Sequence, residues 1–196
     1  MSYHFYFFFK ERVNIALYFI SDFHFDHANI IKYCNRPFKS VKDMNKTMIR
    51  NFLNTVKEGE TCYILGDIFE PRYLGCFQNR KLIIILGNHD RGKKKEEAIY
   101  KVINDFYLDC EICKYPILIK KFLWLSHEPI EFMSPEMPYL NIHGHTHITN
   151  PICGTSSLWK DGNRFFNVSV EQLNYTPISL KDIGKRLGMK GKDLRY

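Results

Sequence analysis

Short, strongly apolar runs recur along the chain between segments that are rich in polar residues. The runs are too short for helices, and they lack the regular alternation of polar and apolar side chains expected of a strand with one face in solvent. They predict strands that are buried on both faces, between other layers of the protein. The runs cover residues 15–20, 62–65, 81–86, 122–125 and 139–142.

A helical pattern is clearest over residues 40–56, where Ser40 is a suitable N-cap and Asp43 follows in the first turn. Weaker patterns predict helices over residues 28–34, 94–104 and 179–187. Residues 106–120 have the composition of short strands and turns. The apolar positions that define the first helix are Val41, Met44, Met48, Phe52 and Val56.

Strands that alternate with helices from Ile15 onward predict a protein of the α/β class. A chain of 196 residues has the usual length of one domain, and no repeat or Pro/Gly/Ser-rich linker divides it. Residues 1–13 differ from the rest because aromatic side chains dominate them. We therefore expect an N-terminal extension over residues 1–13 and a single domain over residues 14–196.

The composition, with 45% hydrophobic and 25% charged residues, excludes the disordered and fibrous classes. No apolar run approaches the ~18 residues that cross a bilayer, and the aromatic start lacks the features of a signal peptide. These observations predict a cytoplasmic protein without a membrane partner.

The formal charge of +7 is concentrated near the end of the chain, where residues 185–195 carry five basic side chains and one acidic one. A second basic cluster contains Arg91 and residues 93–95, followed at once by Glu96 and Glu97. It is read either as the solvated start of a helix or as a region that attracts phosphate. The charge therefore gives only mild support to a polyanionic partner.

Six cysteines are spread along the chain, and we expect them to be reduced thiols. Cys110 and Cys113 form a CxxC pair, which is half of a common zinc site. No second pair accompanies it, so buried or half-buried cysteines on a strand are the favoured interpretation.

All five predicted strands are followed by polar residues of similar chemistry. Asp22 and His24 follow the first, Asp67 the second, and Asn88, His89 and Asp90 the third; His127 follows the fourth, and His143, His145 and His147 lie at the end of the fifth. Ligands of layered α/β proteins bind at the carboxyl ends of strands, so these side chains are expected to converge there. A single such residue is a weak signal, but the repeated pattern predicts a site.

The chemistry of these side chains points to metal ions. Carboxylate, amide and imidazole groups suit Mn²⁺, Fe²⁺ or Fe³⁺, Ni²⁺ and Zn²⁺, whereas a thiolate-rich set would indicate structural zinc. Glycine precedes Asp67, Asn88 and His145, where the chain must turn sharply and leave room for an ion.

The motifs together resemble the five conserved blocks of the calcineurin-like metallophosphoesterases, in order and in approximate spacing. The resemblance, closest to a small bacterial or phage branch, runs from about Ile15 to His147 and includes the ending from Asn167 to Leu180. The blocks are Asp22-x-His24, Gly66-Asp67, Gly87-Asn88-His89-Asp90, His127 and Gly144-His145-Thr146-His147.

This resemblance implies a four-layer α/β/β/α sandwich of two mixed sheets flanked by helices, with two divalent ions at the carboxyl ends of the strands. One ion would be held by Asp22, His24, Asp67 and His147, and the other by Asp67, Asn88, His127 and His145. Asp67 would bridge the two ions, because a carboxylate has two oxygens to share.

The same resemblance makes His89 the general acid that protonates the leaving oxygen, while the two ions clamp the phosphate and activate water. Glu70 occupies a position where several relatives have an aspartate, and a solvent-facing loop residue is the competing interpretation. His27 and Arg36 are expected either to meet substrate phosphate or to cap and pack. His143 is expected to be a packed or supporting histidine.

The predicted function is hydrolysis of phosphomonoesters or phosphodiesters, with nucleotides, cyclic nucleotides and nucleic-acid ends as candidate substrates. No insertion between the motifs is long enough for a large cap domain. The alternative is a catalytically weak, metal-binding scaffold that acts through protein contacts. It is less favoured because every motif residue is present.

Overall fold

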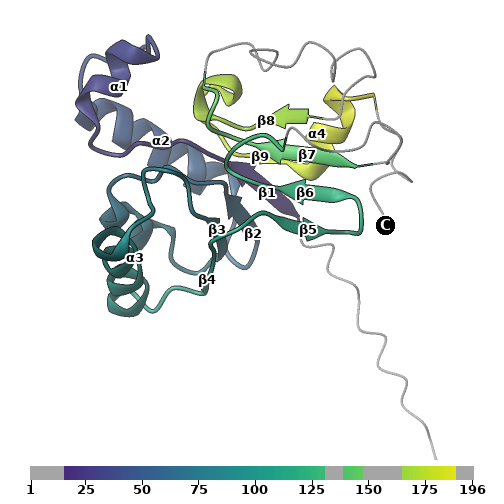
Figure 1. The fold of residues 1–196 in the computed structure, drawn as a ribbon. Coiled ribbons are helices and arrows are strands. Elements are labelled where there is room, and N and C mark those ends of the chain that lie inside the picture. The colour runs from purple at the N-terminus through teal and green to yellow at the C-terminus, as the bar shows by residue number, and fades with distance from the viewer. Residues whose placement is uncertain (1–15, 131–138, 148–164, 189–196) are drawn as a thin grey trace, which may run out of the picture.

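The computed structural model describes residues 16–130, 139–147 and 165–188. The predicted extension over residues 1–13 and most of the basic tail lie outside these ranges, as does Cys153. Figure 1 shows the arrangement of the described helices and strands.

Strands form two mixed sheets. The first has the order β4-β3-β2-β1-β9, in which β1 to β4 are parallel and β9 is antiparallel to β1. Its members are β1 (Leu17–Ile20), β2 (Thr61–Ile64), β3 (Lys81–Ile85), β4 (Cys110–Cys113) and β9 (Ile178–Ser179).

The second sheet has the order β5-β6-β7-β8, and only β5 runs antiparallel to its neighbour. Its strands are β5 (Ile117–Ile119), β6 (Leu123–Leu125), β7 (Leu140–His143) and β8 (Phe165–Asn167). An isolated parallel bridge between Ser21 and Ser169 links the segment after β1 to the segment after β8. The ends of strands from both sheets therefore come together at one place.

The predicted burial on both faces is confirmed for the apolar residues of β2, β3 and β7, whereas β1 and β6 are partly exposed. Along β3, Leu82 and Ile84 pack into a core beneath the helices, whereas Ile83 and Ile85 pack into a second core between the sheets. The second core also receives Leu125 from β6 and other apolar residues of the second sheet. Successive side chains of a strand point to opposite faces, so one apolar run serves two cores.

Helices flank the sheets (Figure 1), which confirms the predicted α/β sandwich of two mixed sheets. Residues of α2, α3 and the 3₁₀-helix η1 line the first core, and α4 contributes to the core between the sheets next to β9. The helices are α1 (Ala28–Tyr33), α2 (Val41–Thr55), α3 (Lys93–Asp105), α4 (Leu180–Arg186), η1 (Pro71–Phe77) and η3 (Val170–Leu173).

Helix α2 begins where the sequence predicts. The Ser40 hydroxyl accepts a hydrogen bond from the Asp43 N–H at 3.1 Å. The apolar face of the helix ends in Phe52, whose ring stacks on Phe77 with the centroids 3.8 Å apart. The cap thus fixes the start of the helix, and the aromatic contact fixes its face against η1.

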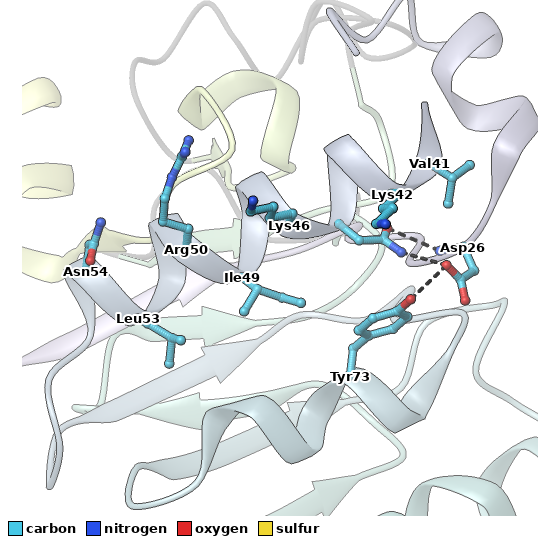
Figure 2. A pocket seen from close by; sticks show the side chains of 10 residues that line it. Asp26, Val41, Lys42, Lys46, Ile49, Arg50, Leu53, Asn54 and Tyr73 are labelled. Carbon is cyan, nitrogen blue, oxygen red and sulfur yellow. Dashed lines mark hydrogen bonds between the residues drawn. The ribbon is translucent and has the colours of Figure 1, made fainter. Parts of the chain in front are cut away.

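The solvent side of α2 borders a cavity of about 750 Å³ (Figure 2). Ile49 and Leu53 give it an apolar wall, and the cations Lys42, Lys46 and Arg50 follow one another along the helix. Asp26 lies at one end, where it accepts a hydrogen bond from the Tyr73 hydroxyl at 3.0 Å. None of the predicted metal ligands lines this cavity.

No helix in the described ranges is long and apolar enough to cross a membrane.

Candidate metal centre

The first sheet places three of the predicted ligand segments side by side, because β1, β2 and β3 are neighbours with the same direction. Asp22 follows β1, Asp67 follows β2 and Asn88 follows β3. His127 follows β6 and His145 follows β7, so the second sheet brings its residues to the same edge. The two sheets therefore contribute to one cluster.

Five of the seven predicted ligands have a positive φ, in the left-handed region that residues with a side chain seldom occupy. Their φ values lie between 43° for His147 and 67° for His145. This conformation costs energy at each position, and such strain concentrates at functional sites. The five residues are Asp22, His24, Asp67, His145 and His147.

One group of donor atoms converges around His127. Its Nδ1 donates a hydrogen bond to the Leu65 carbonyl at 2.8 Å, which leaves Nε2 as the ring nitrogen that faces the cluster. That Nε2 lies 2.9 Å from Asn88 Oδ1 and 3.2 Å from His145 Nδ1. The same Asn88 oxygen lies 3.2 Å from His145 Nδ1.

Asp67 lies between this group and His24. Its Oδ2 is 3.5 Å from His127 Nε2 and 3.4 Å from His24 Nε2. The other oxygen, Oδ1, accepts the backbone N–H of His89 at 2.9 Å. A single carboxylate thus faces donors on both sides.

A second group contains Asp22, His24 and His147, whose ligand atoms all lie within 4.8 Å of one another. Asp22 is fully buried, and its carboxylate accepts the backbone N–H of His145. His24 is also buried, yet neither of its ring nitrogens has a hydrogen-bond partner among the described residues. A buried polar atom without a partner is costly and calls for an explanation, and a bound ion is one of those that fit here.

The histidines of the second group differ in their pKa. Burial, followed by the nearby charges of His147 and Arg36, lowers the pKa of His24 to about 2, so its ring stays neutral and able to bind a metal. Burial also opposes the charged form of His147. Hydrogen bonds with Cys34 and Glu171 and the charge of Asp22 outweigh that effect, and together they raise the pKa of His147 to about 10. A metal ion at His147 would have to replace this proton.

Two glycines allow the clusters to form. A Cβ on Gly87 would clash with the Asp67 carboxylate, and a Cβ on Gly144 would clash with Ser21 and the Asp22 carboxylate. Any side chain at these positions would therefore displace a predicted ligand.

Glu171, which sequence reasoning did not find, supports His147. Its Oε1 lies 3.0 Å from His147 Nδ1, leaving Nε2 of that ring toward Asp22, 3.7 Å away. Metal-binding histidines commonly use their second nitrogen in this way, to contact a carboxylate. Nothing near Glu171 in the sequence indicates the role, because it depends on the return of η3 to the end of β1.

Arg36 was expected to contact substrate phosphate or to pack, and the structure favours packing. It is 4% exposed and donates hydrogen bonds to the carbonyls of Asp22 and Phe23. Its guanidinium also pairs with Glu171 at 2.7 Å. Arg36 thus holds the Asp22 loop and the support of His147 in one buried network.

His89 lies at the border of the cluster, half-buried. Its ring centroid is 5.1 Å from that of His24, and one of its ring nitrogens lies within 4.8 Å of ligand atoms of His24 and Asp67.

The remaining residues singled out in the sequence lie around the cluster. His27 precedes α1 without capping it, and its ring stacks on Phe69. The Glu70 carboxylate accepts a hydrogen bond from the Arg72 N–H. His143 is buried, donates from Nδ1 to the Gly144 carbonyl and packs against Phe165.

The residues fit metal ions. Around His127, two imidazole nitrogens and the Asn88 oxygen lie within 3.2 Å of one another, and all three are atoms that can bind a cation. The His24 nitrogens have no other use among the described residues, and glycines leave space beside both carboxylates. Imidazole, carboxylate and amide donors form the set that divalent transition metals prefer.

The two mixed sheets and the cluster at their strand ends place the chain in one class of protein. It is a layered α/β protein with a candidate metal site at the carboxyl ends of its strands. The chain belongs to the calcineurin-like phosphoesterase superfamily, whose domain model matches residues 15–168. The resemblance seen in the sequence is thus confirmed.

Two relatives extend over nearly the whole chain. An uncharacterized protein of Methanocaldococcus jannaschii, MJ1445, is 38% identical over 186 residues, which cover 91% of this chain and 94% of the relative. The crystal structure of AQ665 from Aquifex aeolicus, a protein of unknown function, has a TM-score of 0.62 and 28% identity. That match covers 87% of this chain and 98% of AQ665.

Proposed function

We propose that the chain hydrolyses phosphomonoesters or phosphodiesters with two divalent ions, one held by Asp22, His24, Asp67 and His147 and the other by Asp67, Asn88, His127 and His145. The family and the donor chemistry support a metal-dependent phosphoesterase. The observation that carries the proposal is the convergence of imidazole and amide groups on both sides of the Asp67 carboxylate.

The two ions, when bound, supply the positive charge that attracts phosphate oxygens and lowers the pKa of a water molecule. The protein residues retain the ions and hold the loops in position. Asp22 and Asp67 provide the negative charge that retains cations in a buried place, and Asp90 and Arg36 hold the loops that carry them. Glycine turns keep the donors close without side chains between them.

His89 is proposed as the general acid. The hydrogen bond from its backbone N–H to Asp67 ties it to the proposed bridging residue. Its half-buried imidazole lies beside the cluster and has access to solvent, so it can regain a proton after each turnover.

The proposal is tested with the full chain, stripped of metal and reloaded with Mn²⁺, Fe²⁺, Ni²⁺ or Zn²⁺. Elemental analysis should find two ions per chain, and p-nitrophenyl phosphate or bis-p-nitrophenyl phosphate should be hydrolysed. Asp67→Asn should lower kcat by about 10²- to 10³-fold or more, because losing one preorganised electrostatic contact already costs that much. The protein should still fold.

Asp105→Asn is the matched control, since Asp105 is a surface carboxylate paired with Lys101. It should retain wild-type turnover. Near-full activity of Asp67→Asn at saturating Mn²⁺ would contradict the bridging role. Two bound ions without hydrolysis of any phosphate ester would instead indicate the scaffold alternative.

A further inference from the structure

A cavity of about 240 Å³ lies beside His89, between the loop after β2 and the start of α3. Phe69, Pro71 and Ile99 contribute apolar lining, and Lys94 and Lys95 contribute cations. Its volume is just below the 300 to 1,000 Å³ of typical small-molecule sites, so it suits one ring system with a small substituent. Its position is relevant because His89 belongs to both the cavity and the candidate metal centre.

Phe69 is an unusual residue in this lining. The residue is 41% exposed and its φ is 71°. It therefore leaves apolar surface in contact with water and adopts an unfavourable backbone conformation. Its position is nevertheless well fixed, since its backbone N–H donates to Asp90 and its ring stacks on His27 with centroids 4.5 Å apart. A held, exposed aromatic ring is a platform on which a flat ligand group can stack.

The lysines carry charge that the described residues do not neutralise. Lys94 and Lys95 are exposed and form no ion pair in the described ranges, whereas Glu96, the next residue, pairs with Lys114 at 2.5 Å. Cations in the first turn of a helix are also unfavourable, because they repel the positive end of the helix dipole. The cavity, whose lining also includes Glu70 and Asp90, therefore has two unpaired cations on its α3 side that can attract an anionic group.

We propose that this cavity receives the leaving group of the substrate, and that the preferred leaving group carries a flat ring and a second anionic group, as in a nucleotide with two phosphates. The inference rests on the proposed function. A general acid must lie beside the leaving oxygen, so a leaving group protonated by His89 extends toward the cavity that His89 borders. Phe69 then stacks on the ring, and Lys94 and Lys95 attract the second anion.

The reaction itself balances without another reactant. A bond forms between phosphorus and the oxygen of water, and the bond between phosphorus and the leaving oxygen breaks. The leaving oxygen takes the His89 proton, and the proton lost by water passes to solvent, from which His89 is reprotonated.

The test compares three leaving groups of similar basicity, using methyl phosphate, adenosine 5′-monophosphate and adenosine 3′,5′-bisphosphate. All three compounds are also tested as methyl diesters, with the methyl group on the 5′-phosphate of the nucleotides or on the phosphate of methyl phosphate. The comparison then holds for both monoesters and diesters. Wild-type kcat/KM should increase in that order. For the bisphosphate, release of adenosine 3′-phosphate identifies cleavage at the 5′ position.

Phe69→Ala should reduce the preference for adenosine 5′-monophosphate over methyl phosphate by about 10-fold, because stacking on an aromatic ring contributes this much per base. Phe69→Leu, which keeps apolar volume without an aromatic face, should lose most of the same preference. The double variant Lys94→Ala/Lys95→Ala should reduce the preference for the bisphosphate over the monophosphate by about 5-fold. Lys42→Ala/Lys46→Ala removes equal charge from α2 and should leave both preferences unchanged.

Binding of adenosine 3′-phosphate, the product that would occupy the cavity, is measured by calorimetry without metal. It should weaken in the Phe69→Ala and Lys94→Ala/Lys95→Ala variants. Hydrolysis with equal kcat/KM for all three leaving groups, or no product binding at millimolar concentration, would overturn the cavity assignment and leave the proposed function standing. Product binding by these residues without hydrolysis of any ester would overturn the proposed function alone.

Discussion

Asp90 joins the loops that follow β2 and β3. Its buried carboxylate accepts backbone N–H groups of Asp67 at 2.7 Å, Ile68 at 2.9 Å and Gly87 at 3.1 Å. Burial and the Asp67 charge raise the pKa of Asp90, while the backbone N–H groups of Gly87, Phe69 and Asp67 act in the opposite direction. Asp90 belongs to a motif visible in the sequence, but its part in holding Asp67 follows only from the fold.

The role of His89 can be tested by the choice of leaving group. His89→Asn should slow hydrolysis of a p-nitrophenyl ester only modestly, because p-nitrophenolate leaves readily as an anion. With an alkyl or nucleoside leaving group, the same change should cost about 10²- to 10⁴-fold in kcat, as is typical of a positioned acid. Steady-state kinetics on both esters, with the bound metal measured in each variant, gives the comparison.

Equal losses on both esters, with both ions bound and chemistry rate-limiting, would contradict the general-acid role. His89 would then stabilise the phosphate or organise the site.

The geometry of strand β4 separates the two cysteines of the CxxC pair. Cys110 and Cys113 lie at opposite ends of β4, three residues apart, and therefore face opposite sides of the sheet. Cys110 packs on the core beneath the helices and Cys113 on the core between the sheets. Burial, together with nearby acidic residues, raises the pKa of Cys110 to about 12. These features favour the strand-cysteine interpretation over half of a zinc site.

At the scale of elements, helix α2 gives a direct test of its cap. Ser40→Ala should lower the free energy of unfolding by about 1 kcal/mol, because the Asp43 N–H loses its acceptor. Ser40→Asp should retain most of the stability, since a carboxylate oxygen can cap the same N–H. Urea unfolding followed by circular dichroism measures both variants, and an unchanged midpoint for Ser40→Ala would show that the cap contributes nothing.

The elements that sequence could predict are those with a strong internal pattern. Helix α2 has many apolar positions at helical spacing, and β3 is a continuous apolar run that needs no neighbour to be recognised. In contrast, β9 has only two residues and exists because it pairs with β1. The convergence of the candidate metal ligands could be predicted from the order of strands and motifs. The roles of Glu171 and Phe69 could not, because they depend on contacts between distant segments that no local pattern reveals.

At the scale of the whole molecule, the candidate ligands are divided between the two sheets, so an ion bound as proposed would connect both. Metal at 100 times its Kd should add about 2.7 kcal/mol to the free energy of unfolding per site. For a domain of this size, that corresponds to an increase in Tm of about 5 to 10 °C per ion. Thermal melts with and without EDTA measure the shift.

Asp67→Asn should reduce this increase in Tm, and Asp105→Asn should reproduce that of the wild type. Two ions bound per chain without any change in Tm would show that metal binds equally to the unfolded chain, and the proposed link between the sheets would be wrong.

The pairing of β9 with β1 has a consequence for the order in which the protein is made. Strand β1 is complete at residue 20, whereas its antiparallel neighbour β9 and Glu171, the partner of His147, are both translated after residue 168. A nascent chain that ends before this point lacks one edge of its first sheet and exposes the strand that precedes Asp22 and His24. Completion of the first sheet and the full surroundings of His147 must therefore wait until the residues after 168 have been translated.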